Sequence, residues 1–103
     1  MKFEKIKEVI YSSDCNRISD HSGSGKSYVG RNRPLWMILE NKRLDLRIWV
    51  TKDFGSLSIT TTKLSAPLNS IEYYESNRQY PCKSQGDMVA RLQEIFAGER
   101  VAA

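Results

Sequence analysis

The chain has 103 residues, which is enough for one hydrophobic core and too few for two, so we expect a single domain over 1–103. Apolar residues make up 40% and charged residues 27%, an ordinary globular balance, and no stretch is apolar enough to cross a bilayer. The net charge of +4 favours an anionic partner only mildly, because a charge of this size also serves solubility.

The N-terminal segment predicts a short amphipathic helix over residues 3–11. Its apolar residues recur near helical spacing at Phe3, Ile6, Val9 and Ile10. The alternative is that the end of this segment closes a strand, because β-branched and aromatic residues favour strands. The segment lacks the continuous apolar core of a secretory signal, so we expect a cytoplasmic protein.

Residues 12–33 are rich in Ser, Gly, Asn and Asp and predict a long polar loop, or loops around a short strand. Within them, Gly25-Lys26-Ser27 matches the end of a phosphate-binding loop. However, Asp20 stands where that motif requires its first glycine, and its charge would repel phosphate. We therefore interpret the segment as a Gly/Ser loop without a nucleotide site.

The cysteine and histidine content indicates neither a metal site nor a cofactor. Cys15 and Cys82 lie far apart in the sequence, and His21 is the single histidine. A zinc site needs about four ligands, and these residues do not supply them at any familiar spacing. Without an export signal, we expect both thiols to be reduced.

The stretch 35–63 carries the clearest pattern and predicts three antiparallel strands. Residues 35–40 form an apolar run that ends in Glu40, 44–50 alternate with period two, and 56–63 follow a turn. With Asn41-Lys42 as a two-residue hairpin loop, all facing pairs on one side are apolar: Leu39–Leu44, Met37–Leu46 and Leu35–Ile48. The next hairpin adds two further pairs to the same side, Val50–Leu57 and Ile48–Ile59.

The C-terminal part predicts a fourth strand over 70–75, a loop over 77–83 and a final helix. Ser84 and Asp87 form a capping box at the start of this helix, and Gly98 ends it. An apolar stripe runs along the helix and consists of Met88, Leu92, Ile95 and Phe96.

These elements together predict an α+β fold. Its centre is an antiparallel β-meander of three to four strands, with an N-terminal and a C-terminal helix packed on one face. We expect residues 99–103 to form a frayed tail.

The face of the meander opposite the apolar pairs is the first candidate site. The candidate macromolecule-binding residues are Lys26, Arg31, Arg33, Trp36, Arg47 and Trp49, with Ser58 and Thr60 alongside. Indole rings stack on bases and arginine binds phosphate, but Trp and Arg also anchor protein interfaces. A third interpretation is that a terminal helix covers this face and makes both tryptophans core. We expect a non-enzymatic module with a protein partner slightly favoured over nucleic acid and no membrane partner, and an exposed edge strand could pair two copies.

The alternative function is a small, metal-independent, toxin-like ribonuclease. His21 would be its proton shuttle, and Arg31, Arg33 and Arg47 would hold the phosphate. This alternative depends on fold-level analogy, and an exposed loop histidine is usually just solvated.

Overall fold

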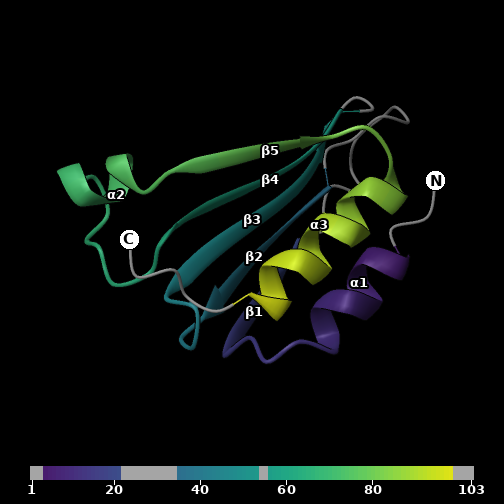
Figure 1. The fold of residues 1–103 in the computed structure, drawn as a ribbon, viewed down its shortest axis with the longest axis horizontal. Coiled ribbons are helices and arrows are strands. Elements are labelled where there is room, and N and C mark those ends of the chain that lie inside the picture. Colours follow the sequence, from purple (N-terminus) through teal and green to yellow (C-terminus); the bar gives the residue numbers. More distant parts are fainter. Residues whose placement is uncertain (1–3, 22–34, 54–55, 99–103) are drawn as a thin grey trace.

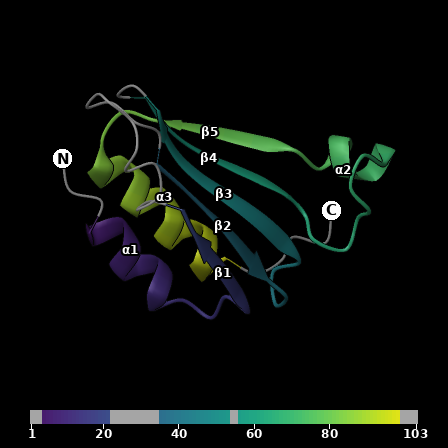
Figure 2. The ribbon, with the colours of Figure 1, turned by 180° about the vertical axis from the view of Figure 1, so that it is seen from behind.

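The computed structural model describes residues 4–21, 35–53 and 56–98, so the predicted tail 99–103 lies outside the described chain. Its elements follow in the order α1 (Glu4–Tyr11), β1 (Arg17–Asp20), β2 (Leu35–Asn41), β3 (Leu46–Asp53), β4 (Ser56–Lys63), α2 (Ile71–Glu75), β5 (Arg78–Cys82) and α3 (Gln85–Ala97). Within the described residues, five strands form one antiparallel sheet in the order β1-β2-β3-β4-β5. Helices α1 and α3 lie side by side on one face of this sheet (Figures 1 and 2), which confirms the predicted α+β class.

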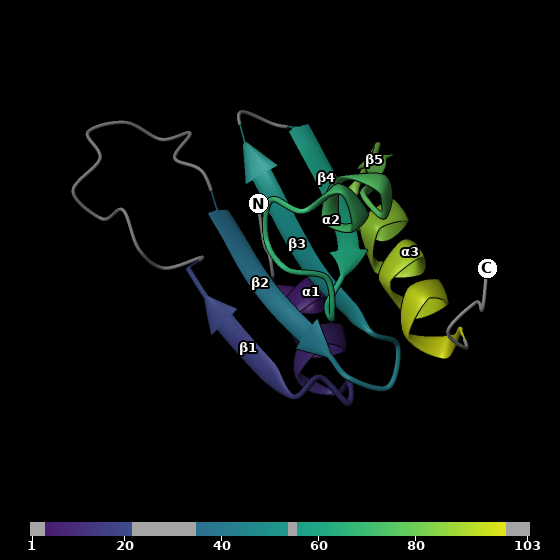
Figure 3. The same ribbon diagram turned by 90° about the vertical axis from the view of Figure 1, so that its left-hand side faces the viewer.

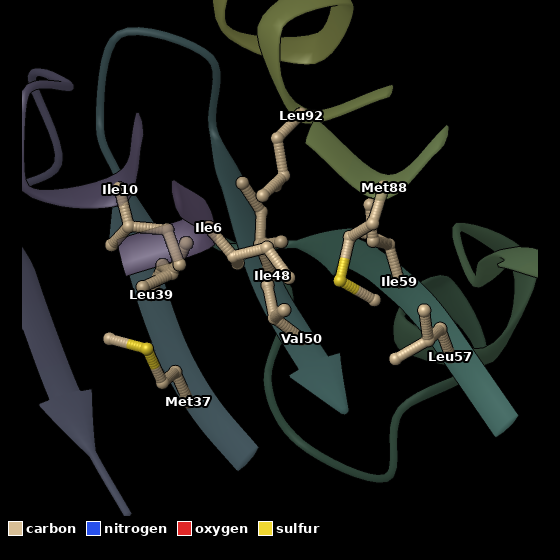
Figure 4. Close-up of a cluster of buried hydrophobic side chains, with 10 residues drawn as sticks. All are labelled: Ile6, Ile10, Met37, Leu39, Ile48, Val50, Leu57, Ile59, Met88 and Leu92. Carbon is tan, nitrogen blue, oxygen red and sulfur yellow. The ribbon is translucent and has the colours of Figure 1, made fainter. Parts of the chain in front are cut away.

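The hydrophobic core lies between the two terminal helices and the sheet. Figure 4 shows its side chains, which are Ile6, Ile10, Met37, Leu39, Ile48, Val50, Leu57, Ile59, Met88 and Leu92. They come from α1, β2, β3, β4 and α3, and all but one are fully excluded from solvent. Burying one such side chain stabilises a fold by about 1.5–3 kcal/mol, so this inner face holds the molecule together.

The predicted pairing of the strands is wrong in register, although the core residues Met37, Leu39, Ile48, Val50, Leu57 and Ile59 all lie on the predicted inner face. Leu39 pairs with Ile48, four residues beyond the predicted Leu44. Val50 pairs with Ile59, two residues beyond its predicted partner. Both shifts are even, and a strand's side chains alternate with period two, so the division into two faces survives the error.

The first register is wrong because the turn between β2 and β3 is longer than two residues. The side chain of Asn41 is fully buried and its Oδ1 accepts a hydrogen bond from the amide of Leu44, at 3.0 Å. Asp45 closes the turn with φ at 55°, a left-handed conformation that Asp tolerates better than most residues. Its carboxylate accepts bonds from the amide and hydroxyl of Ser65, which join this turn to the segment after β4.

Two predictions for the C-terminal part are also wrong. Residues 70–75, predicted as a strand, hold the short helix α2, because the hydroxyl of Ser70 caps it by accepting a bond from the amide of Tyr73, at 3.1 Å. Residues 77–83, predicted as a loop, hold β5. Pro81 is compatible with β5 because this strand is at the edge of the sheet, where a missing amide need not break the ladder.

The polar segment 12–33 contains the opposite edge strand, β1, as the second of the two predicted alternatives allowed (Figure 3). Its side chain Ile18 packs against the core, whereas Arg17 is exposed. Among the helices of the described residues, none has the length and apolar run that crossing a membrane requires.

Candidate functional site

The outer face, defined as the side of the sheet away from α1 and α3, carries the predicted site. Its central side chains are Trp36 and Ile38 of β2, Arg47, Trp49 and Thr51 of β3, and Ser58 and Thr60 of β4. Helices α1 and α3 pack on the inner face (Figure 1), so within the described chain neither terminal helix covers the two indoles.

Three large apolar side chains gather on the outer face and are named here the Trp/Ile patch: Trp36, Ile38 and Trp49. Ile38 lies directly opposite Trp49 across β2 and β3, and Trp36 is the diagonal neighbour of Trp49. Diagonal neighbours in an antiparallel pair lie about 7–8 Å apart, within reach of indole rings. All three residues are half-buried and none belongs to the buried core cluster.

The structure places His21 against this patch. Its imidazole stacks on the indole of Trp36, with ring centroids 5.2 Å apart and planes inclined by 16°. The amide of His21 donates to the carbonyl of Trp36 at 2.9 Å, which extends the β1–β2 ladder by one residue. The histidine of the ribonuclease alternative and a tryptophan of the binding alternative therefore belong to one surface.

Arg47 lies on the same face but does not present a free charge. Its Nε is 3.8 Å from Oε2 of Glu40, and its side chain is only 18% exposed. Its Nη1 and the hydroxyl of Thr62, the residue opposite it on β4, are buried and find no hydrogen-bond partner in the described part of the chain. The guanidinium of Arg47 therefore lies against the sheet surface and is largely excluded from solvent.

The structure also separates Arg47 from His21. His21 is bonded to Trp36, which pairs with Thr51, and Arg47 is four residues away from Thr51 along β3. At about 3.3 Å per residue, the two side chains start roughly 13 Å apart along the strand direction. Hydroxyls fill the face near the patch, where Thr51 and Ser58 are joined by a hydrogen bond of 2.8 Å.

The basic loop residues predicted for the site, Lys26, Arg31 and Arg33, lie outside the described residues.

Sequence reasoning missed a second apolar surface, named here the α2 patch: Leu68, Ile71 and Tyr74. These residues are 61%, 75% and 61% exposed, and they lie just before and within α2, beyond the end of β4 (Figure 1). The β-favouring composition of 70–75 predicted a strand there. The local signal for a helix was Ser70, because serine is favoured at the N-cap position of helices.

A groove of about 580 Å³ lies between the C-terminal ends of α1 and α3. It is lined by Glu8, Val9, Ser12, Ser13, Asp14, Gln93, Phe96 and Ala97. Hydrogen bonds from Arg43 and then from Asn41 lower the pKa of Asp14 to about 2, so this side chain is ionised near neutral pH. The charge of this carboxylate is paired with the guanidinium of Arg43, whose Nε lies 2.7 Å from its Oδ2.

The described histidine, cysteine and acidic side chains were compared with the groupings that bind metal ions. Across the described ranges, no three His, Cys, Asp or Glu side chains are grouped to hold a metal ion. Both cysteines are free thiols, and burial raises the pKa of the Cys82 thiol, which disfavours its reactive thiolate form.

Comparison with known proteins identifies no relative: no protein family, no curated protein and no solved structure matches the chain. The class of the protein is therefore given by its own fold, an α+β domain with a helix-covered inner face and an outer face that carries the Trp/Ile patch among polar side chains.

Proposed function

We propose that this chain is a non-enzymatic protein-binding module and that its outer face contacts the partner. The observation that carries the proposal is the Trp/Ile patch, which places two indoles and an isoleucine on the side of the sheet opposite the core. Tryptophan is among the residues that dominate binding energy at protein interfaces, because it buries a large rigid surface. The stacked ring of His21 enlarges this aromatic surface.

The charge pairing of the cation nearest the Trp/Ile patch favours a protein over a nucleic acid. Binding to nucleic acid depends on cations that neutralise phosphates. Arg47, the cation closest to the Trp/Ile patch on β3, already pairs with Glu40. An apolar contact with a protein uses the indoles without requiring that pair to open.

The cytoplasmic location expected from the sequence is part of this proposal. The free thiols of Cys15 and Cys82 support it, because structural disulfides are typical of oxidising compartments.

The experiment that tests the proposal compares the wild type with Trp49→Ala in binding to a protein captured from its own cell extract after nuclease digestion. We expect the substitution to weaken binding about 30-fold, the effect of an interface anchor worth about 2 kcal/mol. Trp49→Phe should retain most of the affinity, because an aromatic ring remains. Lys5→Ala, on the exposed surface of α1, is the matched control and should bind like the wild type.

Two other experimental outcomes would support a different function. Capture that disappears on nuclease digestion and weakens steeply with salt would identify a nucleic-acid partner. RNA cleavage by the wild type that His21→Ala abolishes would establish the ribonuclease alternative, whereas equal cleavage by both proteins would exclude a catalytic role for His21.

A further inference from the structure

Arg17 of β1 lies at the margin of the outer face. Ile18 packs against the core, and the side chains of a strand alternate between the two faces, so Arg17 lies on the opposite side of the sheet. Arg17 pairs with Glu40 of β2, and Ile38 is therefore its diagonal neighbour. Diagonal neighbours lie about 7–8 Å apart, so the Trp/Ile patch is within reach of the long Arg17 side chain.

Two arginines and one glutamate form a row across β1, β2 and β3 on this face. Glu40 lies between Arg17 and Arg47 in the pairing of the strands. The Glu40 carboxylate forms an ion pair with Arg47, at 3.8 Å. The side chain of Arg17 is exposed and forms no hydrogen bond or ion pair in the described part of the chain. The row therefore has an excess of positive charge, and this excess is located at Arg17.

This unpaired charge indicates the chemistry of the surface that covers the outer face. A guanidinium binds a carboxylate through directed hydrogen bonds, and charged pairs at the margin of an interface help to select the correct partner. A nucleic acid is a poorer match, since its binding depends on several cations that neutralise successive phosphates. An apolar patch with a cation at its border fits a protein surface whose apolar residues are bordered by a carboxylate.

We propose that the partner of the outer face carries an aspartate or a glutamate beside its apolar contact residues, and that this carboxylate pairs with Arg17. The inference rests on the proposed function and adds the charge of the partner surface, which the Trp/Ile patch alone does not define. The two proposals fail separately, because Trp49→Ala leaves Arg17 unchanged and Arg17→Gln leaves both indoles in place.

The first test removes the charge of Arg17 and measures binding to the protein that the wild type captures after nuclease digestion. We expect Arg17→Gln to weaken this binding about tenfold, and Arg17→Lys, which keeps the charge, to retain more of the affinity. Lys5→Gln is the matched control, because it removes an exposed charge on α1, and it should bind like the wild type. Equal binding by Arg17→Gln and the wild type would overturn the inference, and the proposed function would stand if Trp49→Ala still weakened binding.

The second test identifies the group that pairs with position 17. The Arg17→Lys variant is bound to the same protein and treated with a carbodiimide, which couples an amine to a carboxylate in direct contact with it. An amide bond forms, and the water that is lost converts the carbodiimide into a urea. We expect mass spectrometry to locate this bond between position 17 and an Asp or Glu of the partner that has large apolar residues beside it. The exposed amine of Lys5 should form no bond with the partner.

The possible products of this coupling separate the inference from its alternatives. A bond from position 17 to Glu40 alone, a bond to a second copy of this chain, or no bond from position 17 would each overturn the inference. Loss of binding after phosphatase treatment of the partner would also overturn it, because the anion would then be a phosphate. Capture that Trp49→Ala leaves unchanged would instead remove the proposed function, on which this inference rests.

Discussion

Arg43, in the turn between β2 and β3, connects this turn to two segments that are distant in the sequence. Its Nε donates to Oδ2 of Asp14 at 2.7 Å, and its Nη2 donates to the carbonyl of Phe96 at 2.7 Å. It therefore joins the α1–β1 connection to the C-terminal end of α3. A cation at that end also offsets the negative pole of the helix dipole.

The pKa of Asp14 predicts a pH dependence of stability. Its ordinary value is 3.8, and the hydrogen bonds from Arg43 and Asn41 lower it to about 2 in the folded protein. Between these values the unfolded chain binds the proton more readily, so the free energy of unfolding should fall as the pH drops from about 4 to about 2. Urea denaturation measured across this window should show a shallower slope for Asp14→Asn than for the wild type. Identical slopes would mean that this carboxylate is not held in its ionised form by folding.

Asn41 provides a second prediction at this scale. Its buried side chain donates to Oδ1 of Asp14 at 2.9 Å and accepts from the amide of Leu44. Asn41→Ala leaves the buried amide of Leu44 without its acceptor, which should lower the free energy of unfolding by about 1–3 kcal/mol. Chemical denaturation measures the loss, and Lys42→Ala, an exposed neighbour, serves as the control. An unchanged midpoint for Asn41→Ala would contradict this role.

At the scale of elements, the sequence predicted the two faces of the meander but neither register. Alternation with period two depends only on the residues of each strand, so it could be read locally. The turn from β2 to β3 depends on Asn41 binding Asp14, which is 27 residues away in the sequence, and no local pattern reports that contact. The pairing of Glu40 with Arg47 follows from this register and was missed for the same reason.

Removal of the serine N-cap should affect stability differently in α2 and in α3. Ser70→Ala removes the cap of α2, which carries no buried side chain, so we expect faster hydrogen exchange confined to α2. Ser84→Ala removes the corresponding cap of α3, which carries Met88 and Leu92 into the core, and it should lower global stability by about 0.5–2 kcal/mol. Amide exchange by NMR together with thermal melting separates the two. A global loss from Ser70→Ala would show that α2 is needed for the whole fold.

At the scale of the whole molecule, the sheet separates two faces. The inner face forms the core with α1 and α3, and these helices leave the outer face uncovered. Sequence reasoning placed Trp36, Arg47 and Trp49 together on one face, and the structure has them there. The stacking of His21 on Trp36 could not be predicted, because it joins two residues that lie on either side of the connection between β1 and β2. Sequence reasoning also missed the α2 patch, because residues 70–75 were predicted to form a strand with one side packed on the sheet.

Neighbouring residues on β3 test this division directly. Ile48 is fully buried on the inner face, so Ile48→Ala should lower the free energy of unfolding by about 2–5 kcal/mol. Trp49→Ala removes a larger side chain from the outer face and should cost less than Ile48→Ala, because solvent reaches the half-buried indole and no closed cavity is left. Urea denaturation of the two variants gives the comparison. Equal losses would assign Trp49 to the core and remove the basis of the proposed outer-face contact.

The position of α3 after all five described strands has a consequence for how the protein is made. By Cys82 all five described strands have been synthesised, and each pairs with the strand before it, so the sheet can zip up by successive hairpins. The inner face, however, stays uncovered beside Ile59 until Met88 and Leu92 emerge from the ribosome. A nascent chain stalled before this point would expose the aggregation-prone apolar face of the sheet, and chaperones recognise surfaces of this kind.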